Sequence, residues 1–159
     1  MKSLRISAVL AAVLALFAAM PAMAQRAPNG CRIGNPGNIS FGEYTDGQTG
    51  PALAIITLIL SCKGNAIYVD AVITAGPGEN SGDMLDRRLR HKKDPDAYLR
   101  YQLYVDAART RILGDGTRGT EVLVFPFTNR TGQIYGEMPG GQSGVEGEYG
   151  DMIQITVMP

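Results

Sequence analysis

The chain has 159 residues, of which 15 are lysine or arginine and 15 are aspartate or glutamate, so its formal net charge is zero. This balance excludes a chain-wide basic surface of the kind that attracts nucleic acid or anionic membranes. The length suits a single domain, and 20 glycines with no tryptophan indicate many turns and few large aromatic core residues.

Residues 1–24 have the three parts of a secretory signal peptide. Lys2 and Arg5 form a positive start, Ile6–Met20 is almost wholly apolar, and an Ala-Met-Ala sequence supplies the cleavage site. An uncleaved membrane anchor fits less well, because a proline ends the apolar stretch and spanning a bilayer takes about 20 residues. We therefore predict that one exported domain covers residues 25–159, with 13 basic and 15 acidic residues.

The two cysteines, Cys31 and Cys62, both belong to the predicted exported domain. An even number of cysteines in an exported chain is typical of disulfide bonding. A metal site built on the two thiols is the rival hypothesis, but the chain has a single histidine, His91, to complete it. We predict one disulfide, Cys31–Cys62, and no metal.

Alternating apolar and polar residues predict a series of short strands separated by glycine, proline and aspartate turns. The predicted strands are Ile39–Tyr44, Leu53–Leu60, Ala66–Thr74, Tyr98–Val105, Glu121–Phe127, Gln133–Gly136 and Met152–Met158. The second is apolar on both faces, so a short helix is its alternative. Six or seven strands without a convincing amphipathic helix favour an all-β sandwich.

The last predicted strand has an unusual position, because no turn and no partner strand follow it. Ile153, Ile155 and Val157 point to one face, as in a half-buried strand. A sandwich that ends on such a strand lacks its next neighbour and exposes a groove. The pattern therefore favours an assembly protein whose groove another chain fills.

The segment Gly76–Asp96 is charged and has no periodicity, so we predict a long surface crossing. Its carboxylates lie close in sequence to arginines, which favours ion pairs over a calcium site. His91 lies in a basic run with no activated serine or cysteine pattern beside it. A glycine-rich stretch at 114–119 lacks the lysine of a phosphate-binding loop. We predict a protein that is not an enzyme and has no cofactor.

A set of short motifs in a fixed order resembles the spore coat protein U domain, the family that also contains subunits of archaic chaperone–usher pili. The similarity covers Cys31 to Val157, and its most specific pieces are the Tyr101–Thr110 block and the closing Gly-x-Tyr-x-Asp motif. The motifs are Cys31, Phe41-Gly42-x-Tyr44, Ser61-Cys62, Arg88, Leu99–Asp106, Ala107–Thr110, Gly114–Thr117 and Gly147–Asp151.

The resemblance implies an incomplete immunoglobulin-like sandwich whose last strand is supplied in trans. A periplasmic chaperone supplies it first, and the N-terminal extension of a sibling subunit replaces it during assembly at an outer-membrane usher. Ile153, Ile155 and Val157 would line the acceptor groove. In the closing motif, Tyr149 would fold back onto nearby backbone, and Asp151 would cap a turn.

One feature departs from the family's donor role. Only residues 25–30 precede Cys31, and Pro28 removes a hydrogen-bond donor from this short segment. We therefore predict a subunit that mainly accepts a strand and reaches the cell surface or a fimbrium through the periplasm. The alternatives are a misassigned chain start, or a secreted coat-like or adhesin-like surface protein that binds a ligand through its charged segment Gly76–Asp96.

Overall fold

The computed structural model describes residues 31–34, 38–62, 70–126 and 131–158. The predicted signal peptide (1–24) and the segment before Cys31 lie outside these ranges. Within them, no helix is long and apolar enough to cross a membrane. The strands are β1 (Cys31–Gly34), β2 (Ala52–Cys62), β3 (Asp70–Gly78), β4 (Arg87–His91), β5 (Tyr98–Tyr104), β6 (Leu123–Pro126), β7 (Thr131–Met138), β8 (Tyr149–Gly150) and β9 (Ile153–Met158).

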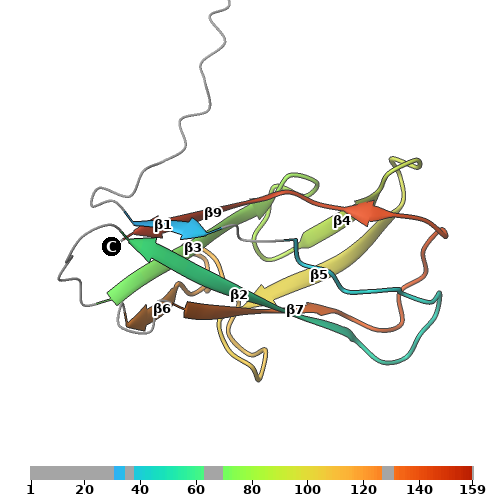
Figure 1. Ribbon diagram of the computed structural model, residues 1–159. Helices are drawn as coiled ribbons and strands as arrows, with labels where there is room; N and C mark the ends of the chain where they lie inside the picture. Colours follow the sequence, from blue (N-terminus) through green and yellow to red (C-terminus); the bar gives the residue numbers. More distant parts are fainter. Residues whose placement is uncertain (1–30, 35–37, 63–69, 127–130, 159) are drawn as a thin grey trace, which may run out of the picture.

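The strands form two antiparallel sheets that pack face to face (Figure 1). The larger sheet has the order β1-β2-β7-β5-β4-β8, and the smaller has the order β6-β3-β9. Inward side chains alternate along each strand and fill the space between the sheets. The most deeply buried aliphatic side chains are Leu58, Leu60, Ile73, Leu103, Leu113 and Ile134. The all-β sandwich predicted from the alternation is confirmed.

The charged segment Gly76–Asp96 differs from its prediction, because it contains strand β4. The inward positions of β4 are Arg87, Leu89 and His91, and all three are buried. Two of these side chains are polar, so the strand has no apolar alternation for sequence analysis to detect. The prediction of a continuous surface crossing, with His91 exposed in a basic run, was therefore wrong.

The predicted strand Ile39–Tyr44 is also wrong, because residues 38–44 form no strand. The alternation there has another cause. Ile39 and Phe41 point their side chains onto the core while the backbone stays outside both sheets. Alternation records which side chains are buried, and a segment laid over a sheet edge produces the same pattern as a paired strand.

The β1–β2 ladder places Cys31 directly opposite Cys62. Opposite residues of antiparallel strands have Cα atoms about 4.5–5.5 Å apart, which lies within the range of about 4.4–6.8 Å that disulfides span. We propose on this register that the two residues form the disulfide predicted from the sequence. It would join the first strand of the larger sheet to its neighbour.

Replacing both Cys31 and Cys62 with serine is expected to lower the free energy of unfolding by about 3 kcal/mol, because the disulfide no longer restricts the unfolded chain. Urea denaturation of residues 25–159 with and without reductant measures this. Reductant should destabilise the wild type and leave the serine variant unchanged. Two titratable thiols in the unreduced wild type would contradict the proposal.

Candidate functional site

A long groove runs along one side of the sandwich, between an edge of each sheet. β1 is an edge strand of the larger sheet, and β9 is an edge strand of the smaller one. The groove encloses about 1810 Å³, well above the roughly 300–1,000 Å³ of small-molecule pockets. Its lining comes from β9, from residues 38–46 and from inward side chains of β4 and β5. This shape suits an extended segment better than a compact ligand.

β9 presents three aliphatic side chains to the groove, Ile153, Ile155 and Val157. They alternate along the strand, as the sequence predicts, but each is only partly buried. On β3, the directly opposite residues Ala75 and Ile73 are fully buried. The two strands differ because β3 has a neighbour on both sides, whereas β9 has one only. The inner face of β9 therefore borders an unfilled part of the core.

The backbone of β9 also has one edge without a partner strand in the described part of the chain. Its pairing with β3 uses one edge of the strand, and no strand in the described part of the chain pairs with the other edge. Such an edge presents a row of N–H and C=O groups that another strand can bind. Free main-chain groups and partly filled side-chain positions thus lie side by side in the groove.

Residues 38–46 form the opposite wall, which the sequence did not predict. Ile39 and Phe41 lie directly over Gly136 of β7, where an added Cβ would come within 2.6 Å of Ile39 Cδ1. The Phe41 ring contacts the Tyr101 ring at a centroid distance of 5.7 Å. Tyr44 anchors the end of the segment by donating its hydroxyl to the Pro139 carbonyl at 3.1 Å. Side chains, not strand pairing, hold this wall in place.

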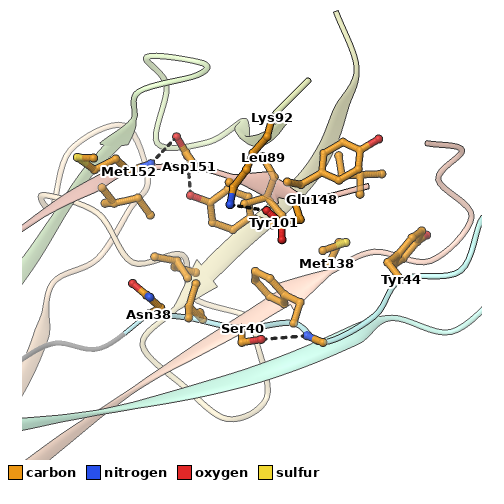
Figure 2. A pocket seen from close by; sticks show the side chains of 18 of the residues that line it. Asn38, Ser40, Tyr44, Leu89, Lys92, Tyr101, Met138, Glu148, Asp151 and Met152 are labelled. Atoms are coloured by element: carbon orange, nitrogen blue, oxygen red, sulfur yellow. Dashed lines mark hydrogen bonds and ion pairs between the residues drawn. The ribbon is translucent and has the colours of Figure 1, made fainter. Parts of the chain in front are cut away.

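Asp151, which the sequence predicts as a turn cap, accepts hydrogen bonds at the start of β9. Its Oδ2 accepts the Tyr101 hydroxyl at 2.7 Å, as Figure 2 shows. Its Oδ1 accepts the Asn80 backbone N–H at 3.2 Å, the Asn80 side-chain amide at 3.0 Å and the Met152 N–H at 2.9 Å. An added Cβ at Gly78 would lie 1.8 Å from Oδ2, so this position requires glycine.

The Tyr101–Asp151 bond fixes where β9 begins. Burial raises the pKa of the Tyr101 hydroxyl well above its usual range, and the hydrogen bond to Asp151 raises it further. The hydroxyl therefore remains a proton donor over the whole physiological pH range. Beside it, the β3–β9 register shifts by a bulge between Ala75 and Gly78. The bond therefore holds the chain two residues before β9 begins at Ile153.

Tyr149 lines the groove, and its ring packs against His91. The Tyr149 hydroxyl donates to the Val145 carbonyl at 2.8 Å, and its ring lies edge-on to His91 at 5.0 Å. His91 Nδ1 accepts the Asp94 N–H at 2.8 Å, so its other nitrogen carries the proton toward the Glu146 carbonyl at 3.2 Å. These contacts tie the groove-lining loop 144–150 to the β4–β5 hairpin. Sequence analysis missed the role of His91, because its partners are backbone groups.

An exposed ion pair joins the same two elements. Lys92 Nζ lies 2.6 Å from Glu148 Oε2 (Figure 2), and the Lys92 N–H donates to the Glu148 carbonyl at 2.8 Å. The hydrogen bond from Lys92 lowers the pKa of the Glu148 carboxyl. Because both side chains are well exposed, solvent screens the pair and it contributes little to stability. Its main effect is to orient the loop.

Two of the five acidic residues of the segment 76–96, Asp83 and Asp86, have basic partners. Arg118, distant in sequence, holds Asp83 with two hydrogen bonds of 3.0 and 3.1 Å. The Leu85 N–H and Arg118 together lower the pKa of the Asp83 carboxyl. Arg88 pairs with Asp86. Among the described residues, no three histidine, cysteine or acidic side chains gather in a group able to hold a metal ion.

Comparisons with known proteins agree with this architecture. The sequence profile of the Spore Coat Protein U domain matches residues 16–156. A solved chain from a chaperone–tip adhesin complex of CFA/I fimbriae is similar with a TM-score of 0.55 and 15% identity, over 82% of this chain and 42% of that one. A chain from a chaperone–tip adhesion subunit complex of archaic Csu pili of Acinetobacter baumannii has a TM-score of 0.47 and 14% identity, over 80% and 38%.

The present chain thus spans about two fifths of the length of these solved chains. No curated protein sequence matched it. The first of the two likenesses supports the immunoglobulin-like form of the sandwich that the resemblance implied, and that prediction is confirmed.

Proposed function

The chain belongs to the spore coat protein U domain family, and on this premise we propose that it is an exported structural subunit of a chaperone–usher-type pilus or surface fibre. It is not an enzyme, and it assembles by accepting a β-strand from another chain. Its partners are a periplasmic chaperone first, and then sibling subunits at an outer-membrane usher. It passes through the periplasm to the cell surface.

The open groove beside β9 is the observation that supports this proposal. Ile153, Ile155 and Val157 face an unfilled part of the core, and the adjoining backbone edge is free in the described structure. A strand inserted there gains main-chain hydrogen bonds from the edge and side-chain pockets from the groove. An extended peptide with alternating apolar residues could therefore supply both the missing main-chain hydrogen bonds and the missing side-chain packing.

The energetics favour such a peptide. Full burial of an aliphatic side chain contributes about 1.5–3 kcal/mol, and an inserted strand would complete the burial of three from β9 while burying its own. Ordering the peptide opposes this gain. An alternating peptide, which can place its apolar side chains on one face, should therefore bind more tightly than a peptide with the same composition in scrambled order.

The test is periplasmic expression of the exported chain, followed by mass and unfolding measurements with and without a synthetic donor-strand peptide. The peptide copies the N-terminal extension of a subunit encoded beside this one. We expect the chain alone to be folded but prone to self-association, because its edge is open, and to become a monomer of higher stability with the peptide. A stable monomer that no alternating peptide affects would contradict the proposal.

A further inference from the structure

The outer face of the β4–β5 hairpin gathers three arginines and a tyrosine, which we call the arginine face. In the ladder, Arg88 lies opposite Arg100, and Arg90 lies opposite Tyr98. Directly opposite residues of antiparallel strands share a face. The residues between them, such as Leu89, point inward and are buried. Two rigid strands therefore hold these four side chains on the solvent side.

The positive charge of this face is only partly neutralised. Asp86 is the carboxylate in contact with it, paired with Arg88 and 3.8 Å from Arg100, whose side chain is 72% exposed. Arg90 is exposed and forms no ion pair within the described part of the chain. On its other side Arg90 lies opposite Gly150 of β8, which has no side chain to cover it.

Placing Arg88 directly opposite Arg100 lowers the stability of the hairpin, and the fold does not require this pairing. Like charges directly opposite each other destabilise an antiparallel pair, and the inward residues of the same strands already bind the hairpin to the core. Groups that oppose local stability in this way commonly serve a binding function. None of the four side chains lines the groove, so the face suits a ligand that lies along the outer surface of the hairpin.

We propose that the arginine face binds an anionic polysaccharide. Guanidinium groups match sulfate and carboxylate oxygens with paired hydrogen bonds, and residues two apart on a strand place their side chains about 6.7 Å apart. Tyr98, 37% exposed beside Arg90, offers a ring on which a sugar can lie. Because the chain as a whole carries no excess of basic residues, its net charge alone does not account for such an attraction.

The arginine face and the groove use opposite sides of the same strands. Leu89 and Leu99 line the groove, while their neighbours Arg88 and Arg100 point to solvent. Figure 1 shows the hairpin at the end of the molecule far from β6. A polysaccharide bound outside therefore leaves the groove free for a strand, and binding does not depend on the function proposed for the groove.

Immobilised heparin is the probe, and neutral dextran is the blank. The exported full-length chain should bind heparin with an affinity that falls as salt rises, and dextran should not retain it. Replacing Arg90 and Arg100 together with alanine should weaken heparin binding about tenfold or more, because two charge-assisted contacts are lost. The matched control replaces Arg111 and Arg118, which are 54% and 58% exposed elsewhere on the surface, and should stay within about twofold.

Urea unfolding curves of both double variants verify that the fold is intact. Absence of heparin binding at low salt would overturn the proposal. So would an equal loss in the two double variants, because net charge alone would then explain retention. Duplex DNA that binds as tightly as heparin at equal charge would overturn it as well, since the face would then lack preference for a polysaccharide.

Discussion

Ile155→Asp is expected to abolish capture of a partner strand while leaving the isolated sandwich folded. Ile155 is the middle of the three aliphatic side chains that β9 turns to the groove, and it is only partly buried without a partner. In the free chain, water still reaches an aspartate there. Once a strand covers the groove, the carboxylate is buried without a counter-charge, which costs several kcal/mol, and the burial of an isoleucine, about 2 kcal/mol, is lost.

Affinity for the donor-strand peptide should therefore fall by at least about a hundredfold. Gln154→Asp is the matched control, because it adds the same charge to the same strand on the exposed opposite face. Fluorescence titration with the labelled peptide and co-purification with the periplasmic chaperone measure both variants. Unchanged binding by the Ile155 variant would show that partners engage another surface.

Arg87→Met is expected to lower the free energy of unfolding by about 3 kcal/mol or more, because it removes hydrogen bonds from a fully buried charged group. The Arg87 side chain is 0% exposed. It donates to the carbonyls of Gly76 and Leu113, each at 2.9 Å, and to that of Met84 at 3.1 Å. It also donates to the Gln102 side chain. Methionine fills much of the volume but takes the donor from the Gly76 and Leu113 carbonyls, whereas the Met84 carbonyl and Gln102 Oε1 each keep another donor.

The removal of a buried charge offsets part of this loss. Burial lowers the pKa of the Arg87 guanidinium, which reflects the cost of desolvating its charge. We still expect a net destabilisation, since acceptors from several segments of the chain each lose a hydrogen bond at once. Arg90→Met, at an exposed position of the same strand, should change stability by no more than about 0.5 kcal/mol. Urea denaturation compares the two, and equal midpoints would refute the role assigned to Arg87.

The local residue pattern predicts those strands in which apolar and polar side chains alternate. Tyr98–Val105 alternates, and the strand β5 is found there with Leu99 and Leu103 inward. The last strand alternates as well, and its apolar residues do face the core side. The order of short motifs identified the family before any geometry was known. These signals are local, so a single sequence contains them.

The second wall of the groove was beyond such reasoning. Ile39 and Phe41 alternate like strand residues, and only the packed structure places them over Gly136 and across from β9. Gly136, over which the two side chains pack, lies almost 100 residues further along the chain. No local pattern records which distant surface a pair of apolar side chains will cover.

Side-chain alternation and chain order are local properties, and they were enough to predict an all-β sandwich. The inward positions of Arg87 and His91 on a strand, in contrast, became visible only in the folded chain. Burying a polar side chain is favourable only when hydrogen-bond partners surround it, and here those partners include Leu113 and Glu146, far away in the chain. Long-range packing brings these partners together, so they cannot be predicted from the residues next to Arg87 or His91 in the sequence.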